Sequence, residues 1–124
     1  MIFIDRSIPK SVASALKAVR DDVAWLEDMF RHDTRDTDWL RDAGKSGWLV
    51  ISRDKRIRTR PGERAAILEN RVGCFIVTVR QNPTRWGYLK LLCATLDEMQ
   101  RLFEETARPF VFTVDSRLKP KRVA

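Results

Sequence analysis

The chain has 124 residues, 44% of them hydrophobic and 33% charged, which suits one globular core and excludes a disordered chain. No apolar run approaches the roughly 20 residues that cross a bilayer, and the N-terminus lacks the features of a secretion signal, so we expect a cytoplasmic protein without a membrane partner. The 24 Lys and Arg residues outnumber the 17 Asp and Glu, and the resulting charge of +7 favours a polyanionic partner such as nucleic acid.

The first half of the chain alternates short apolar runs with helical patterns. Residues 2–4 predict a buried strand, and the following helix has Ser7 as its cap and opens through Pro9. Residues 23–26 form a second candidate strand, and a polar segment follows. A second helix ends at a pair of glycines, and its apolar residues are Trp39, Leu40 and Ala43.

The second half continues this alternation. Residues 48–51 give the clearest strand, and Pro61 opens a helix whose apolar side carries Ala65, Ala66 and Leu68. Residues 74–78 predict a fourth strand and 110–114 a fifth. Between them, a long amphipathic helix is predicted from Thr84 to Thr106 by Trp86, Leu89, Cys93, Leu96, Met99 and Phe103.

Alternating strands and helices predict an α/β fold, a three-layer α/β/α sandwich with a mainly parallel central sheet of about five strands. The strands are apolar throughout, as in sheets that helices cover on both faces. We assign residues 1–116 to this domain and 117–124 to a loose basic C-terminal tail. In open sheets of this kind, ligands bind beyond the carboxyl ends of the strands.

Three aspartates are expected at that edge. Asp5 and Asp54 each follow a buried strand, and Asp36 shares one helix face with Trp39 and Leu40. Each of the three could instead cap a turn or helix. Converging carboxylates repel one another, and a divalent cation removes that cost. Oxygen ligands suit Mg²⁺ or Mn²⁺, which can orient a water molecule for attack on phosphorus.

Basic residues gather beside these aspartates. Such side chains would hold an RNA backbone over an acidic pocket without reading its sequence, although a solvated charged loop is the simpler explanation. The residues are Arg6, Arg53, Lys55, Arg56, Arg58 and Arg60.

Other chemistries have little support. His32, the only histidine, lies in a polar loop, and the cysteines show no metal-binding spacing, so Cys74 and Cys93 are expected to be buried free thiols. The four tryptophans fall in strand or helix patterns, which favours core packing over base stacking.

Several runs resemble the PIN-like ribonuclease toxins related to VapC. They are Phe3-Ile4-Asp5 with Ile8-Pro9, Thr34-Arg35-Asp36-Thr37-Asp38-Trp39-Leu40 with Ala43-Gly44, Trp48 to Asp54, Arg56-Ile57-Arg58 and Pro61 to Ala66.

This resemblance implies a Mg²⁺- or Mn²⁺-dependent endoribonuclease of a type II toxin–antitoxin pair. Asp5, Asp36 and Asp54 would be its metal-binding acids, and Ser52 a supporting hydroxyl. A fourth acid is common in such nucleases, but residues 79–82 offer none, which leaves Asp38 and Asp115 as candidates. The implied partners are an RNA substrate and a cognate antitoxin, which can be a helix-turn-helix DNA-binding protein, and a homodimer is left open.

Two other functions remain open. A catalytically degenerate PIN-like module that binds RNA or protein would explain the missing fourth acid. A phosphoacceptor domain would use Asp54, but such domains have an acidic pair after the first strand, where this chain has Asp5-Arg6.

Overall fold

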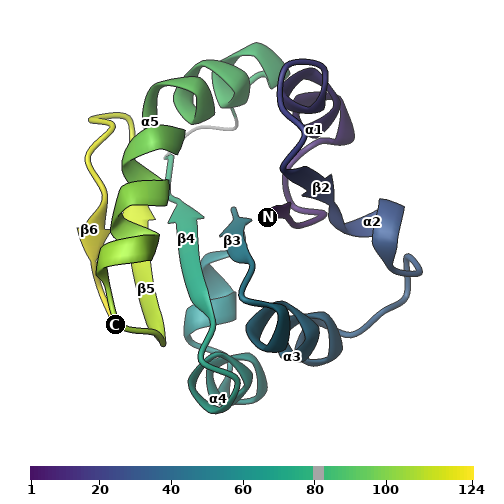
Figure 1. Ribbon diagram of the computed structural model, residues 1–124, viewed down its shortest axis with the longest axis vertical. Coiled ribbons are helices and arrows are strands. Elements are labelled where there is room, and N and C mark those ends of the chain that lie inside the picture. Colours follow the sequence, from purple (N-terminus) through teal and green to yellow (C-terminus); the bar gives the residue numbers. More distant parts are fainter. Residues whose placement is uncertain (80–82) are drawn as a thin grey trace.

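The computed structural model describes residues 1–79 and 83–124, whose strands and helices are traced in Figure 1. In chain order the elements are β1 (Ile2–Ile4), α1 (Lys10–Lys17), β2 (Val23–Trp25), α2 (Leu26–Met29), α3 (Asp36–Ser46), β3 (Leu49–Ser52), the 3-10 helix η1 (Lys55–Arg58), α4 (Pro61–Glu69), β4 (Gly73–Val77), α5 (Arg85–Glu105), β5 (Phe110–Val114) and β6 (Lys121–Arg122). All five predicted strands are present within one or two residues of the expected bounds.

The strands form one sheet in the order β2-β1-β3-β4-β5-β6. The first five are parallel, and β6 pairs antiparallel with β5. Helices α1 and α5 cover one face of this sheet, and α3 and α4 cover the other (Figure 1). The predicted three-layer fold is therefore confirmed, with a sixth strand supplied by residues 117–124, where the sequence predicts a loose tail.

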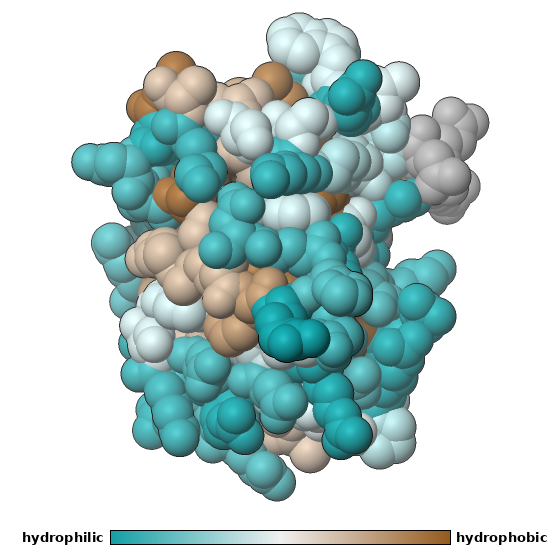
Figure 2. Space-filling model, turned by 90° about the vertical axis from the view of Figure 1, so that its right-hand side faces the viewer, coloured by the Kyte–Doolittle hydropathy of each residue, from teal (hydrophilic) through white to brown (hydrophobic). Residues whose placement is uncertain are grey.

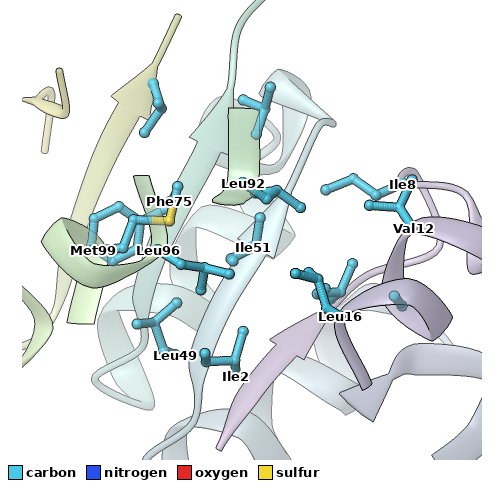
Figure 3. Close-up of a cluster of buried hydrophobic side chains, with 14 of the residues drawn as sticks. Ile2, Ile8, Val12, Leu16, Leu49, Ile51, Phe75, Leu92, Leu96 and Met99 are labelled. Atoms are coloured by element: carbon cyan, nitrogen blue, oxygen red, sulfur yellow. The ribbon is translucent and has the colours of Figure 1, made fainter. Parts of the chain in front are cut away.

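The core consists of two apolar layers because strand residues alternate between the faces of the sheet. Ile2 and Ile4 of β1 pack toward α1 and α5, together with Ile51 of β3 (Figure 3). Phe3 and Val50, the residues between them, pack toward α3 and α4. The same alternation directs Asp5, the residue just beyond β1, toward the α3 and α4 side.

Helix α5 has the predicted extent but a different buried face. Its buried residues are Tyr88, Leu91, Leu92, Thr95, Leu96 and Met99. Trp86 is 64% exposed and Cys93 is exposed, so the expectation that both lie in the core is wrong. Cys74 is buried as predicted. Residues spaced by three or four positions can form either of two neighbouring stripes along one helix. Contact with the sheet determines which of the two stripes is buried.

Two other apolar residues also lie outside the core. Helix α1 ends at Lys17, which leaves Val19 exposed, and α4 buries Ala66 and Ile67 while Leu68 is exposed. On the face that carries α1, α2 and α3, hydrophilic residues predominate and hydrophobic ones form small separate patches (Figure 2). Among the described residues, no helix combines the length and the apolar character needed to cross a membrane.

Candidate active site

A pocket of about 750 Å³ lies where β1, β3 and β4 end. Asp5, Asp36 and Asp54 all line it, from three separate elements, as the sequence predicts. The other lining residues are Arg6, Ser7, Arg53, Lys55, Arg56, Arg60, Val77, Thr78 and Val79.

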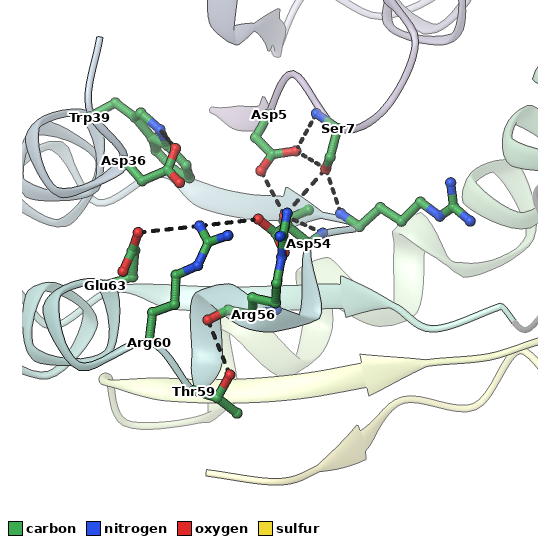
Figure 4. Close-up of polar contacts among 11 residues, drawn as sticks. Asp5, Ser7, Asp36, Trp39, Asp54, Arg56, Thr59, Arg60 and Glu63 are labelled. Atoms are coloured by element: carbon green, nitrogen blue, oxygen red, sulfur yellow. Dashed lines mark hydrogen bonds and ion pairs between the residues drawn. The ribbon is translucent and has the colours of Figure 1, made fainter.

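Asp5 is held by hydroxyl groups at the ends of two adjacent strands (Figure 4). The Ser52 hydroxyl donates to Asp5 Oδ2 at 2.6 Å, and the Ser7 N–H donates to Oδ1 at 3.0 Å. The Ser7 hydroxyl also donates to Oδ1, and it accepts from the backbone N–H of Arg53 at 2.8 Å. Ser52, which the sequence predicts as a supporting hydroxyl, thus contacts Asp5 directly, and its role in function stays a prediction. Ser7 does not cap α1, since Pro9 occupies the N-cap position.

The Asp5 carboxyl group is only 4% exposed. Burial raises its pKa from the ordinary 3.8 to about 6. The hydrogen bonds from Ser52 and Ser7 partly oppose this shift, and the negative charge of Asp36 adds to it. The hydrogen-bond partners of the buried Asp5 carboxylate are therefore neutral groups. A bound cation would stabilise its negative charge.

Asp36 lies in the first turn of α3. Arg35 is at the N-cap position, and the carboxylate of Asp36 makes no capping bond to the backbone. Instead, Asp36 Oδ1 accepts from the indole N–H of Trp39 at 2.9 Å, and the Trp39 ring lies against Phe3 in the core. The buried indole thus fixes the direction of the carboxylate, one turn away on the same helix face.

Asp54 has both a local structural role and a place in the pocket. Its Oδ1 accepts from the backbone N–H and from Nε of Arg56, both at 3.0 Å, which caps η1. Arg60 Nη1 lies 3.9 Å from the other oxygen, Oδ2, and 3.6 Å from Glu63 Oε1. The alternative that Asp54 caps a turn is therefore correct as a description of its contacts, and it coexists with a position at the pocket wall.

The predicted basic residues divide into three groups. Arg53, Lys55, Arg56 and Arg60 line the pocket, whereas Arg58 is not among its lining residues. Arg6 also lines it, but its guanidinium donates to the backbone carbonyls of His32 and Thr34, which ties β1 to the segment that leads into α3. Arg6 thus positions Asp36 indirectly.

The proposed extra acids lie away from the pocket. Asp38 is half exposed and pairs with Arg41, and Asp115 accepts from the Arg117 N–H. Of residues 79–82, Val79 lines the pocket and residues 80–82 lie outside the described residues.

Sequence reasoning missed Glu63, whose side chain is 17% exposed and shares Arg60 with Asp54 (Figure 4). Like Asp36 in α3, Glu63 is an acidic residue in the first turn of its helix, although it is the third residue of α4 and Asp36 is the first of α3.

The donor chemistry of the pocket fits a hard divalent cation. Its carboxylates suit Mg²⁺ or Mn²⁺, and Asp36 lies close enough for its charge to raise the pKa of Asp5. Within residues 1–79 and 83–124, however, no three acidic, His or Cys side chains are already grouped as a set of metal ligands. Asp54 would have to exchange its contact with Arg56 for the ion.

A family model described as PIN like domain matches residues 1–79. The match covers more than half of the chain and includes all three pocket aspartates, so the protein belongs to the PIN-like domain family. Comparison with curated proteins and with solved structures gave no match.

Proposed function

We propose that the protein is a metal-dependent endoribonuclease and that Asp5, Asp36 and Asp54 bind its Mg²⁺ or Mn²⁺. The observation that carries this proposal is the convergence of three aspartates from three elements on one pocket, in a chain of the PIN-like family. The pocket combines these three aspartates with five basic side chains, an arrangement that suits a phosphodiester bound beside a cation.

In this mechanism the protein holds the substrate and orients the attacking water. Arg53 and Lys55 at the pocket wall bind phosphate oxygens without contacting the bases. Ser52 and Ser7 donate hydrogen bonds that favour the ionised form of Asp5. The metal ion, when bound, supplies positive charge to the phosphoryl oxygens and lowers the pKa of its water. Arg56, which contacts Asp54, would be able to reach a phosphate in the pocket if an ion took its place at that carboxylate.

The test is cleavage of a mixed RNA pool by purified protein with Mn²⁺, with Mg²⁺ and with EDTA. We expect cleavage only with metal, and a loss of at least 100-fold in Asp5→Asn, since the removed charge is a ligand. Asp38→Asn is the matched control because Asp38 lies two residues from Asp36 and outside the pocket. Cleavage that survives EDTA, or that Asp5→Asn retains, would contradict the proposal.

We also propose that the nuclease is the toxin of a type II toxin–antitoxin pair. Membership of the PIN-like family and the resemblance to VapC-related toxins support this role. Expression of the chain should arrest growth, and Asp5→Asn should abolish the arrest. Its antitoxin would cover the pocket, so co-expression should restore growth and yield a stable complex.

One observation favours a second function, that of a non-catalytic PIN-like module that binds RNA or protein. Asp54 is engaged by Arg56 and Arg60, which would leave two aspartates for an ion if those contacts persisted. RNA binding without turnover in either metal would support this module over the nuclease.

A further inference from the structure

Trp86 is an exposed aromatic residue on α5, a helix whose other side is buried against the sheet. It lies in the first turn of α5 and is 64% exposed, whereas Tyr88, two residues later, is buried. Because two residues correspond to about 200° of helix rotation, the two rings point away from each other. Tyr88 therefore belongs to the packed side of α5. Packing within the domain does not explain why position 86 carries an indole.

Trp86 forms part of a groove between α5 and α1, which lie side by side (Figure 1). The groove has a volume of about 470 Å³, and its lining residues are Ser11, Val12, Thr84, Arg85, Trp86 and Leu89. Volumes of this size accommodate small ligands or parts of larger ones. The lining combines the apolar side chains of Val12, Trp86 and Leu89 with the hydroxyl groups of Ser11 and Thr84.

The charged side chains placed at the groove are two cations. Arg85 lines it, and Lys90 Nζ lies 5.9 Å from the centre of the Trp86 ring. The described lining residues include no Asp or Glu. An exposed aromatic ring flanked by cations suits a nucleobase that stacks on the ring while its phosphates meet the charges. A protein partner could also pack an apolar side chain against Trp86. It would be attracted to the two cations only if it were acidic, whereas RNA always carries phosphates.

The groove lies at the same edge of the sheet as the candidate active site. Helices α1 and α5 follow β1 and β4, whose carboxyl ends form the pocket. Arg53 lines the pocket, and its guanidinium lies 5.7 Å from the ring centre of Tyr88 in α5, the helix whose first turn carries Trp86. A strand that extended from the pocket past Arg53 would therefore reach the first turn of α5.

We propose that this groove is a second subsite for single-stranded RNA, in which an unpaired base stacks on Trp86 and Arg85 and Lys90 bind the flanking phosphates. The proposal rests on the proposed function in one respect, namely that RNA is the substrate. The subsite would hold the substrate strand at a distance from the cleaved bond and so favour unpaired over duplex RNA.

The test measures binding in EDTA, so that it does not depend on cleavage. A fluorescein-labelled 12-nucleotide RNA without secondary structure is titrated with the full chain and followed by anisotropy. We expect Trp86→Ala to weaken binding about tenfold, within the range for loss of one stacked base. Trp86→Phe should retain most of the affinity. Leu68→Ala, which removes another exposed apolar side chain, from α4, is the control and should bind like the parent chain.

Two further readouts identify stacking. RNA should quench the indole emission of the parent chain, and Trp86→Phe should lose most of this quenching while it still binds. An RNA duplex of the same length should bind equally to the parent chain and to Trp86→Ala, because its bases are already stacked. Circular dichroism checks that the variants are folded.

Equal binding of the single strand by Trp86→Ala and the parent chain would overturn the proposal. So would a change of oligomeric state in Trp86→Ala with unchanged RNA affinity, which would assign the groove to contact between copies. A failure of the proposed nuclease is distinguishable, because it would appear as lack of cleavage while Trp86-dependent binding persisted.

Discussion

At the scale of single residues, Asp5 is the group whose environment departs furthest from that of an ordinary carboxyl group on the surface. Burial raises its pKa from 3.8 to about 6, although three hydrogen bonds favour the charged form. A fold selected for stability alone would place a neutral residue here. The destabilising charge is therefore consistent with a functional role for Asp5.

This environment predicts how stability depends on pH. The folded protein binds the Asp5 proton more tightly than the unfolded chain does, so the stabilisation is complete below about pH 4 and is lost as pH rises through about 6. The free-energy difference between the two protonation states that this rise implies is ~3 kcal/mol. In EDTA at pH 7.5, Asp5→Asn should therefore be more stable than the parent chain, as measured by urea unfolding.

The advantage of Asp5→Asn should vanish as the pH falls below the ordinary pKa of 3.8, where Asp5 becomes protonated in both states. Asp38→Asn, which alters a half-exposed carboxylate, controls for general charge effects. An identical pH dependence in Asp5→Asn and the parent chain would show that Asp5 is not the titrating group.

At the scale of elements, the pocket depends on a close approach between α3 and the segment after α4. A Cβ atom built on Gly44 would lie 2.1 Å from the backbone oxygen of Asn70, a contact that no side-chain movement can relieve. The two helices that carry Asp36 and Glu63 are thus held together at a glycine.

Two alanine substitutions test this contact. Gly44→Ala should destabilise the fold by ~3 kcal/mol or more, since helices must separate. Gly62→Ala, in the first turn of α4, has its nearest contact at 3.8 Å and should be neutral or stabilising by up to ~1 kcal/mol. The urea midpoints of both variants, compared with the parent chain, measure the difference. Equal midpoints would mean that the helices can move apart without cost.

The C-terminal residues 117–124 contribute backbone hydrogen bonds to the sheet at β5. Val111 donates its N–H to Ala124 O at 3.1 Å, and its carbonyl accepts from the Val123 N–H at 2.9 Å. Deletion of residues 117–124 should lower the free energy of unfolding by ~2–3 kcal/mol, as backbone bonds and the packing of Val123 are lost. The double substitution of Lys121 and Arg122 by Gln keeps the backbone and should change the unfolding free energy little. A truncated chain as stable as the parent would restore the view of a loose tail.

The elements that sequence reasoning predicted correctly are those with local signals. Ile2–Ile4 and Leu49–Ser52 are apolar throughout because helices cover both faces of a parallel sheet. The β6 strand has no such signal, because two charged residues join the sheet only through backbone pairing with β5. The rotation of α5 about its axis also depends on contacts with residues distant in sequence. For this reason the spacing of apolar residues alone does not show that Trp86 is exposed.

The candidate site follows the same division. The placement of Asp5, Asp36 and Asp54 at one edge was predictable from topology, since the carboxyl ends of parallel strands share that edge. The contacts of Ser7 with Asp5 and of Arg56 with Asp54 were not, because they depend on how the chain turns after each strand.

At the scale of the whole molecule, the net charge is +7, and five basic side chains line the pocket beside its three aspartates. RNA binding should therefore weaken with salt, and each phosphate contact should contribute about −0.7 to the slope of log K against log salt concentration. Lys55→Gln should reduce the magnitude of this slope by about that amount, because Lys55 lines the pocket. Lys119→Gln changes the net charge equally at an exposed position outside the pocket and should leave the slope unchanged. Anisotropy titrations at several KCl concentrations measure both, and equal slopes in the two variants would contradict a local role for Lys55.

The two outer strands of the sheet also bear on how the protein behaves at high concentration. Unpaired backbone groups along an outer strand invite pairing with a strand of another molecule, the first step of fibrillar aggregation. Here β2 has three residues and leads directly into α2, and β6 has two residues, both cationic. A second chain that approached β6 would meet positive charge and find little backbone to pair with. The strand that joins the C-terminus to the sheet thus also keeps neighbouring copies apart in a crowded solution.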